Sequence, residues 1–349
     1  MGMIKIPESA IKFFQKNLND IFSSGNLAEG KWNQELSSYV ADYCNVNNAV
    51  PTSSNGSGLV ALLLVYKEYF RRSDVLIQSN TMYGVKTMVY SAGCNLAGFI
   101  DCTLNTLMPS FEQVKKGVEE FKGDKSNLII LLSHIGGIIN PDIDKISEYC
   151  KSENLILLED CAHSYGATLN NKHSGTFGDA GVFSFYATKS VPAGEGGIVI
   201  TKHDDIGEFT KRFIIYDRFK QEMNIGANNR PSEIQALLIY AVVKHADEII
   251  KNKKEIADKY IEACNRLSIP FIKQNSQNSI GNYYKFVIYN NNTPIDGYLP
   301  ALKTKTSPVY DYCLGNSKLI TTNHACLPIW YGQEISVTDK VITELYESR

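Results

Sequence analysis

Short apolar runs alternate with amphipathic stretches through the first half of the chain. The runs at Leu128–Ser133 and Leu155–Glu159 are apolar almost throughout, which is typical of strands covered by helices on both faces. Three other runs predict strands at Asn48–Pro51, Val75–Gln78 and Leu96–Ile100. The segments between the strands predict helices at Leu59–Tyr69, Ser110–Phe121 and Asp142–Ser152. This alternation predicts βαβ units that build a mostly parallel sheet, and therefore an α/β fold.

Two more β-rich runs, Gly181–Phe185 and Gly197–Thr201, are joined by a loop that contains three glycines. We expect this pair to form a hairpin-like edge of the sheet. From Pro231 to about Arg266 apolar residues recur at helical spacing, which predicts one long helix leading into a second domain.

The last part of the chain contains less regular structure. A short strand is expected at Tyr284–Tyr289, and a closing helix at Val337–Tyr346 with Ser336 or Thr338 as its N-cap. We expect a large domain over residues 1–240 and a smaller C-terminal α/β domain over residues 241–349.

Composition narrows the class of protein. With 349 residues, 44% of them hydrophobic, the chain is long enough to bury a sizeable core. A formal net charge of -2 argues against nucleic-acid binding, which needs a clustered excess of lysine and arginine. Eight scattered cysteines without a CxxC pair predict free thiols, with neither a metal site nor a disulfide framework. Because neither a signal peptide nor a membrane-spanning run is evident, we expect a cytoplasmic protein.

Asp160 ends the apolar run of the segment LILLEDCAHSYGA. That position places its carboxylate at the carboxyl edge of the sheet, where open α/β folds bind ligands. Burial of an ionised carboxylate at this edge costs free energy unless a cation or hydrogen-bond donors contact it. The alternative is a plain N-cap for the following helix.

Lys189 follows a predicted strand in the segment GVFSFYATKSVPAGEGGIVIT. A lysine is ordinarily a solvated surface charge. Here Gly194, Gly196 and Gly197 follow it, and these glycines would let the backbone approach a bound cofactor closely. In that setting Lys189 is a candidate nucleophile toward an aldehyde.

The segment PTSSNGSGLVALLL runs from a strand through a small polar loop into an apolar helix. Free N–H groups at the start of such a helix form an anion site suited to phosphate. Gly56–Ala61 also fits the dinucleotide pattern G-x-G-x-x-A, which suggests an NAD-dependent oxidoreductase as an alternative. That alternative needs an acidic residue at the end of the next strand, where the sequence VLIQSN has none.

A phosphate site, a carboxylate at a strand end and a lysine in a glycine-rich loop are together what pyridoxal 5′-phosphate (PLP) requires. They would hold the phosphate, the pyridine nitrogen and the aldehyde, respectively. We therefore predict a PLP enzyme that carries its cofactor on Lys189 as a Schiff base and pairs Asp160 with the ring nitrogen.

These motifs resemble those of the DegT/DnrJ/StrS family of nucleotide-sugar aminotransferases, which have the fold-type I PLP architecture. LEDCAHSYGA resembles the family's pyridine-nitrogen motif, FSFYATKSVPAGEGGIVIT its lysine motif and NGSGLVALLL its phosphate-binding turn. SSGNLAEGKW resembles the family's opening segment, and NIGANNRPSEIQALL the segment that reaches the partner's active site. The resemblance therefore implies a homodimer with shared active sites.

The resemblance also implies roles for individual residues. It assigns the phosphate to the N–H groups of Gly56 and Ser57 and to the Ser184 hydroxyl, with Asn228 reaching the phosphate of the partner subunit. His163 stands near the phenolic oxygen, and the residue that stacks on the ring is Met82 or Tyr83. The substrate-binding residues that it implies are Arg230, Asn26 and Tyr310.

The activity that the resemblance implies is transfer of an amino group from an amino acid, by analogy L-glutamate, to a keto-sugar. PLP would alternate with pyridoxamine 5′-phosphate, and the acceptor would be a nucleotide-linked 3- or 4-keto-6-deoxyhexose used for a surface polysaccharide or a secondary metabolite. Segments such as RFIIYDRFK depart from the family's pattern, so the identity of the sugar stays open.

Two alternatives accompany this prediction. Some relatives use PLP or pyridoxamine phosphate to dehydrate a sugar, and they carry histidine in place of the lysine, so Lys189 favours transamination. A non-catalytic protein that binds sugar nucleotides on the same fold is the other alternative.

Overall fold

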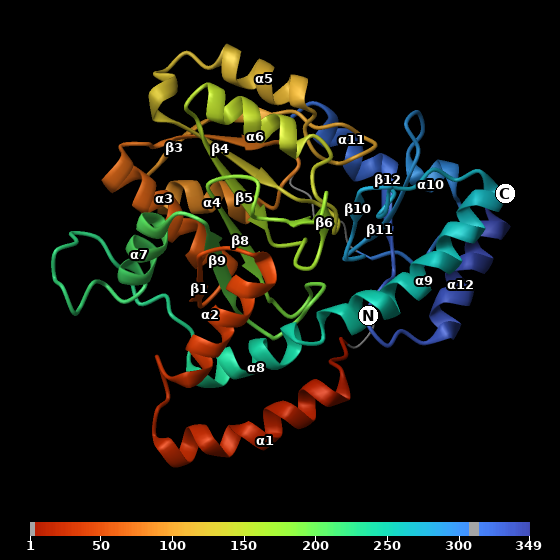
Figure 1. The fold of residues 1–349 in the computed structure, drawn as a ribbon. Helices are drawn as coiled ribbons and strands as arrows, with labels where there is room; N and C mark the ends of the chain where they lie inside the picture. The colour runs from red at the N-terminus through yellow and green to blue at the C-terminus, as the bar shows by residue number, and fades with distance from the viewer. Residues whose placement is uncertain (1–3, 307–313) are drawn as a thin grey trace.

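A seven-stranded sheet lies at the centre of the protein (Figure 1). The computed structural model describes residues 4–306 and 314–349, so the predicted substrate residue Tyr310 lies outside the described residues. The strand order is β1-β9-β8-β5-β4-β2-β3. The strands are β1 (Asn48–Thr52), β2 (Asp74–Gln78), β3 (Asn95–Ile100), β4 (Leu128–Ser133), β5 (Ile156–Cys161), β8 (Ala180–Ser184) and β9 (Gly197–Thr201). β9 is antiparallel to both of its neighbours, β1 and β8, and all other neighbouring strands of this sheet are parallel to each other. The prediction of a mostly parallel α/β sheet is therefore confirmed.

The predicted strands match the observed ones closely, but their arrangement differs at one point. β8 and β9 are antiparallel neighbours, as expected for a hairpin-like pair. They do not form the edge of the sheet, because β1 pairs with the other side of β9, from Asn48 opposite Thr201 to Thr52 opposite Gly197. The edge strands are therefore β1 and β3.

Alternate residues along each central strand pack against different helices. Ile129 and Leu131 belong to one apolar core, which contains residues of α3 (Asn55–Phe70), α4 (Tyr83–Ser91) and α7 (Asp204–Phe213). Ile130 and Leu132 belong to another core, with residues of α5 (Phe111–Glu120) and α6 (Ile143–Ser152). Helices therefore cover both faces, which explains why LIILLS is apolar throughout. The helices predicted in these regions are confirmed.

The helix predicted from Pro231 to about Arg266 is two helices, α8 (Glu233–Val243) and α9 (Ala246–Leu267). The backbone at His245 leaves the helical conformation, with φ -111° and ψ 16°. The break lets each helix bury a different surface. α8 lies in an apolar core with α1 (Glu8–Ser24) and α2 (Lys31–Cys44), whereas most of α9 packs against the C-terminal part (Figure 1).

The C-terminal part has its own apolar core, in which α9 packs beside α12 (Ile335–Glu347). The predicted strand at Tyr284–Tyr289 is β11 (Phe286–Tyr289), which pairs with β12 (His324–Leu327). The predicted cap of the closing helix was wrong. The N-cap position of α12 is Glu334, without a side-chain cap, and the Thr338 hydroxyl instead accepts a hydrogen bond from Gln333 at 2.9 Å.

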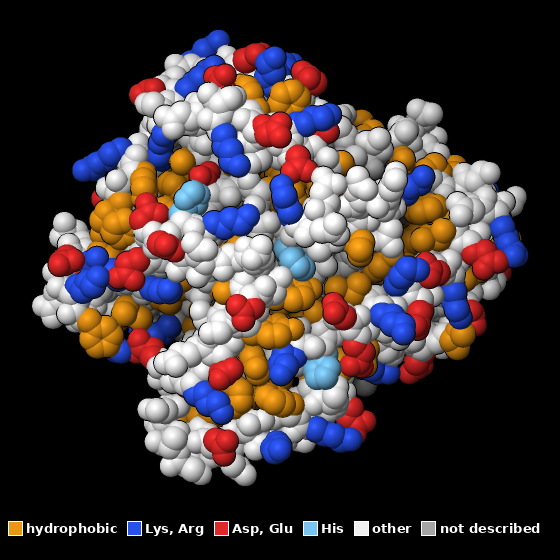
Figure 2. Space-filling model, viewed as in Figure 1, with side chains coloured by type: hydrophobic (Ala, Val, Ile, Leu, Met, Phe, Trp, Pro, Cys, Tyr) orange, Lys and Arg blue, Asp and Glu red, His pale blue; other side chains and the backbone are white. Residues whose placement is uncertain are grey.

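Short elements complete the described ranges: η1 (Lys125–Asn127), β6 (Thr168–Leu169), β7 (Lys172–His173), β10 (Ser279–Ile280), α10 (Ile295–Tyr298) and α11 (Asn316–Asn323). Within the part of the chain that the structure describes, no helix combines the length and the apolar character needed to cross a bilayer. On the face seen in Figure 2, lysine and arginine side chains are interspersed with aspartate and glutamate.

Candidate active site

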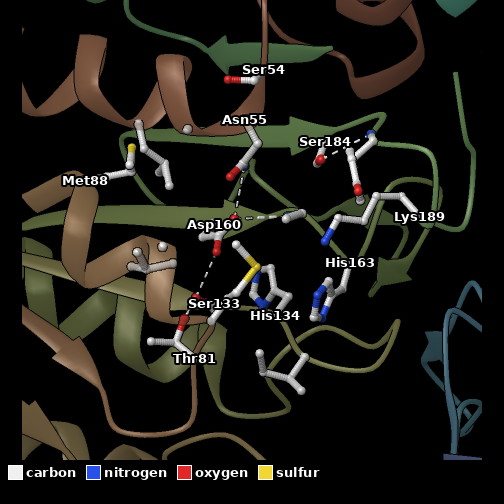
Figure 3. A pocket seen from close by; sticks show the side chains of 18 of the residues that line it. Ser54, Asn55, Thr81, Met88, Ser133, His134, Asp160, His163, Ser184 and Lys189 are labelled. Atoms are coloured by element: carbon white, nitrogen blue, oxygen red, sulfur yellow. Dashed lines mark hydrogen bonds between the residues drawn. The ribbon is translucent and has the colours of Figure 1, made fainter. Parts of the chain in front are cut away.

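A cavity of about 430 Å³ lies at the carboxyl ends of β4, β5 and β8, beside the start of α3 (Figure 3). This is the edge of the sheet where the strand-end carboxylate was expected to lie. Six of the predicted site residues line it together: Gly56, Met82, Asp160, His163, Ser184 and Lys189. A volume of this size is in the range of cofactor and substrate pockets.

The Asp160 carboxylate is buried and held by three donors. Its Oδ1 atom accepts hydrogen bonds from Asn55 Nδ2 and the Ala162 N–H, both at 3.1 Å. Its Oδ2 atom accepts one from the Ser133 hydroxyl at 3.0 Å, and Ser133 is 2.7 Å from the Thr81 hydroxyl. Because every donor stabilises the ionised form, the carboxylate presents a fixed negative charge to the cavity. An N-cap role alone does not explain this arrangement.

The start of α3 borders the cavity where the anion site was predicted, but only some of the predicted donors line it. Ser54 and Ser57 make a reciprocal capping box, in which the Ser57 N–H donates to the Ser54 hydroxyl at 3.1 Å. Ser57 does not line the cavity, so the structure does not place it where the phosphate was predicted. The N–H groups of Asn55 and Gly56 lie at that point instead, and no described residue accepts a hydrogen bond from either.

The amine of Lys189 points into the cavity (Figure 3) and lies 5.4 Å from the centre of the Tyr284 ring. Burial lowers the pKa of this amine to about 8, the Asp160 carboxylate acts in the opposite direction, and the charge of Lys285 lowers it further. A lysine with this pKa is far more often neutral near physiological pH than an exposed one, as a nucleophilic or basic amine must be.

His163 lies next to Lys189 and is also buried. Its Nδ1 atom accepts a hydrogen bond from the Gly136 N–H at 3.4 Å, so its single ring proton is on Nε2. Burial, followed by the charges of Lys189 and Lys285, holds the pKa of His163 well below its usual value. The imidazole is therefore a neutral hydrogen-bonding group beside the cavity.

A buried pair behind Asp160 was not predicted. Glu159 accepts hydrogen bonds from the N–H groups of Gly175, Phe177 and Gly178 and lies 2.7 Å from His134 Nε2. His134 Nδ1 accepts from the Asn140 N–H, so Nε2 carries the proton and donates to Glu159. The ligand atoms of His134, Glu159 and Cys161 lie within 4.8 Å of one another, but those of His134 and Glu159 are already used in these hydrogen bonds.

One asparagine from the C-terminal part joins two loops of the cavity. Asn282 Nδ2 donates to the backbone oxygens of His163 and Tyr165, at 2.8 Å and 2.9 Å. Its own backbone oxygen accepts from the hydroxyl of Ser190, the residue after Lys189, at 2.9 Å. The loop after Asp160 and the loop of Lys189 thus share one anchor.

None of the three glycines after Lys189 lines the cavity, and two of them, Gly196 and Gly197, are required by packing. A Cβ atom on Gly197 would lie 2.5 Å from the backbone carbonyl of Ser54, and one on Gly196 would collide with Ile239. Gly194 faces open space. The close backbone approach that the structure shows at Gly197 is therefore to the start of α3.

The remaining predicted residues lie at or beyond the rim. Met82 lines the cavity and Tyr83 does not, although both are exposed. Asn26 and Asn228 are exposed and do not line the cavity. Arg230 lines a separate shallow cavity of about 230 Å³, where it lies 3.4 Å from Glu29 and donates to Asn228 at 2.7 Å.

The dinucleotide alternative fits the structure poorly. β1, which precedes Gly56, is an edge strand and does not neighbour β2, unlike the first strand of a dinucleotide-binding fold. The end of β2 carries Gln78, whose side chain donates to the backbone oxygen of Asn80 at 2.7 Å. Gly58 is needed for packing, because a Cβ there would lie 2.7 Å from Val182.

Comparison with the sequences of known proteins finds relatives over about two thirds of this chain. The chain is 30% identical over 246 residues to the GDP-perosamine synthase of Escherichia coli O157:H7, and 29% identical over 252 residues to that of Vibrio cholerae. These alignments cover 69% and 70% of this chain, but only 65% and 66% of the relatives, slightly under two thirds of their length.

Two solved structures superpose on nearly the whole chain. The aminotransferase TlmJ of Streptoalloteichus hindustanus gives a TM-score of 0.86 at 19% identity, covering 100% of this chain and 98% of that one. The PLP form of a sugar aminotransferase candidate from Streptococcus pneumoniae gives 0.83 at 15% identity, covering 99% and 98%. At these identities the structures establish the fold alone.

A sequence model of one family matches residues 8–312, which is most of the chain. The chain belongs to the DegT/DnrJ/EryC1/StrS aminotransferase family.

Proposed function

We propose that this protein is a PLP-dependent aminotransferase that moves an amino group from an amino acid to a nucleotide-linked keto-sugar. The observation that carries the proposal is the meeting, in one cavity, of the Lys189 amine, the Asp160 carboxylate and the free N–H groups of Asn55 and Gly56. The amine matches the aldehyde of PLP, the carboxylate matches its ring nitrogen, and the N–H groups match its phosphate.

The residues of the cavity fit the cofactor's three polar groups. The N–H groups of Asn55 and Gly56, together with the Ser184 hydroxyl, would hold the phosphate, because they are donors at the positive end of α3. Asp160 would keep the ring nitrogen protonated, and His163 Nε2–H would donate to the phenolic oxygen.

When bound, PLP supplies an aldehyde that reacts with amines and a ring that withdraws electrons, and it alternates with pyridoxamine 5′-phosphate. Lys189 would bind the aldehyde through Nζ. When its amine is free and neutral, the same atom would be the base that accepts the proton from the donor's α-carbon. Asp160 holds its negative charge in place throughout, because three donors fix its position.

The substrate class rests on the relatives. Proteins with which this chain aligns are named as GDP-perosamine synthases and as transaminases of dTDP-linked amino sugars. We propose a keto-sugar of that kind as acceptor and L-glutamate as donor.

We further propose a homodimer, in which Asn228 reaches the phosphate of the partner subunit's cofactor, and a division of the chain near residue 240. The first proposal is supported by the exposure of Asn228 beside Arg230. The second is supported by the break between α8 and α9 and by the separate C-terminal core.

The test uses purified protein and its absorbance spectrum. The wild type should carry a lysine-linked cofactor band that L-glutamate bleaches, and Lys189→Ala should lose both the band and turnover. Lys202→Ala, an exposed lysine after β9, is the matched control and should keep both. A panel of keto-sugar nucleotides, analysed by mass spectrometry for the gain of an amino group, then identifies the acceptor.

Turnover that survives in Lys189→Ala would contradict the assigned role of this lysine. A wild-type protein that forms no band with added PLP would contradict the cofactor itself.

A further inference from the structure

The two oxygens of the Asp160 carboxylate have unequal surroundings. Oδ1 accepts two hydrogen bonds, from Asn55 Nδ2 and from the Ala162 N–H. Oδ2 accepts one from the described residues, from the Ser133 hydroxyl at 3.0 Å. Each oxygen of an ionised carboxylate accepts about two hydrogen bonds. Oδ2 is therefore the oxygen with acceptor capacity left for a donor in the cavity.

The contacts of Ser133 fix the direction of its proton. Besides Asp160, its hydroxyl contacts the Thr81 hydroxyl at 2.7 Å, and Figure 3 shows both contacts. An ionised carboxylate is an acceptor only, and a hydroxyl has a single proton to donate. The Ser133 proton therefore goes to Asp160, and Thr81 must supply the proton of the other contact. The chain of hydrogen bonds runs in one direction, from Thr81 through Ser133 to Asp160.

Both hydroxyl residues are buried, with 1% of Thr81 and 3% of Ser133 exposed. In such surroundings a hydrogen bond to an ionised acceptor is stronger than one between neutral groups. A donor on the Ser133 oxygen polarises its hydroxyl, and so strengthens the hydrogen bond from Ser133 to Asp160. Thr81 thus strengthens a contact that it does not itself make.

One buried side chain holds the backbone next to both hydroxyl residues. Gln78, at the end of β2, accepts a hydrogen bond from the Ser133 N–H at 3.1 Å. Its Nε2 atom donates to the backbone oxygen of Asn80, the residue before Thr81, at 2.7 Å. Gln78 therefore fixes the segment after β2 relative to the end of β4, and with it the contact between the two hydroxyls.

We propose that Thr81 and Ser133 are positioning residues for Asp160, and that their directed chain of hydrogen bonds holds the oxygen that would face the ring nitrogen of the cofactor. The inference rests on the proposed function, because it concerns the carboxylate that would pair with that nitrogen. Thr81 acts only through Ser133. Its contribution therefore requires the Ser133 hydroxyl, and this requirement distinguishes a chain from two independent contacts.

The experiment uses PLP that carries ¹⁵N in its ring. The ¹⁵N chemical shift of the bound cofactor reports protonation of the ring nitrogen, and titration of cofactor-free protein gives the affinity for PLP. Ser133→Ala leaves a carboxylate that attracts the shared proton more strongly, so the signal should move toward that of the unprotonated ring. We expect PLP affinity to fall by about tenfold. Thr81→Val should act in the same direction, with an affinity roughly two- to threefold lower.

The double substitution tests the order of the chain. Without the Ser133 hydroxyl, Thr81→Val should change neither the chemical shift nor the affinity further, so the two substitutions are not additive. Thr81→Ser keeps a hydroxyl and should reverse the effects of Thr81→Val. The control is Thr210→Val on α7, a buried threonine that donates to the Ile206 backbone oxygen at 2.7 Å and does not line the cavity.

An unchanged chemical shift and affinity in Ser133→Ala would overturn the inference. Effects of Thr81→Val that are as large without the Ser133 hydroxyl as with it would also overturn it. Should Ser133→Ala not fold, the comparison of Thr81→Val with Thr81→Ser decides, because equal values would remove Thr81 from the chain. A wild type that binds no PLP contradicts the proposed function instead, so the two failures are distinguishable.

Discussion

The side-chain amide nitrogen of Asn55, Nδ2, lies 3.1 Å from Oδ1 of Asp160 and 3.0 Å from the backbone oxygen of Val182. One side chain at the first position of α3 therefore fixes the carboxylate of β5 relative to β8. Because the backbone N–H of Asn55 faces the same cavity, the anion site and the carboxylate are held by a single residue.

Substitution of Asn55 should impair the orientation of Asp160 in a graded way. Asn55→Ala removes one of three donors, so we expect roughly a tenfold slower reaction with the amino donor. Asn55→Asp should slow this reaction further, because a second carboxylate beside Asp160 raises the pKa of one of the two carboxyl groups. Stopped-flow spectroscopy of the donor half-reaction measures both, with the exposed Asn265→Ala as control. Equal rates for Asn55→Asp and wild type would rule out this role.

Asp160→Asn should retain cofactor but slow proton transfer. The amide keeps the shape of the carboxylate and loses the charge that favours a protonated ring, so we expect a loss of roughly 100-fold to 1,000-fold. The lysine-linked band should still form, and the rate at which L-glutamate bleaches it should fall. A rate within a factor of two of wild type would show that the ring charge is not needed.

The pKa of Lys189 makes the cofactor-free protein's stability depend on pH. The folded-state pKa of about 8 lies below the ordinary value of 10.5, so between these values the unfolded chain binds more proton than the folded one. The contribution of this lysine to the free energy of unfolding therefore rises as the pH increases from about 8 to 10.5. Urea unfolding of wild type and Lys189→Met at several pH values isolates this contribution. Parallel curves for the two proteins would be inconsistent with the shift.

Gly197→Ala should disturb the anion site from outside the cavity. The new Cβ would lie 2.5 Å from the Ser54 backbone, so the start of α3 must move. We expect PLP affinity to fall by about tenfold or more. Gly297→Ala, whose Cβ would meet Thr293 at an ordinary 3.6 Å, is the control. Titration of cofactor-free protein with PLP gives both affinities, and an unchanged affinity in Gly197→Ala would mean that the helix start tolerates the movement.

Glu233 holds the start of α2 and should matter for stability more than for chemistry. Its buried carboxylate accepts hydrogen bonds from the N–H groups of Gly30, Trp32 and Asn33, at 2.9, 2.7 and 3.1 Å. Glu233→Gln turns an amide N–H₂ toward these donors, so we expect a loss of roughly 2–4 kcal/mol in the free energy of unfolding. Urea denaturation against the exposed Glu35→Gln measures the difference. A loss equal to that of the control would show that water replaces the carboxylate.

The strands of the sheet were predictable because their burial on both faces is recorded locally, as unbroken apolar runs such as Leu128–Ser133. α2 was missed although its buried residues, Trp32, Leu36, Val40 and Cys44, recur every four positions, which is a helical signal. The position of β1 outside β9 could not be read locally. It depends on pairing between segments about 150 residues apart, from Asn48 to Thr201.

The residues of the active site also divide into those with a local sequence signal and those without one. Asp160 and Lys189 were predicted because each lies at the end of an apolar strand run, in a motif with a chemical meaning. The partners that orient them were not, because Asn55 is 105 positions from Asp160, and nothing near it in the sequence records that contact. The buried Lys253 of α9, which donates a hydrogen bond to Ser190 in the lysine loop, was not predicted for another reason. It lies among exposed lysines of an amphipathic helix, and only the fold turns it inward.

Asn282 hydrogen-bonds to both the loop of His163 and the loop of Lys189. These two contacts limit which segments of this protein can be exchanged with those of a relative. A chimaera that takes its C-terminal segment from a relative, in order to change which sugar is accepted, imports a new residue at this position. Unless that residue is again an asparagine, the loop of His163 loses its side-chain donor, and only the backbone contact with Ser190 remains. The graft then alters the reactive centre along with the specificity that it was meant to change.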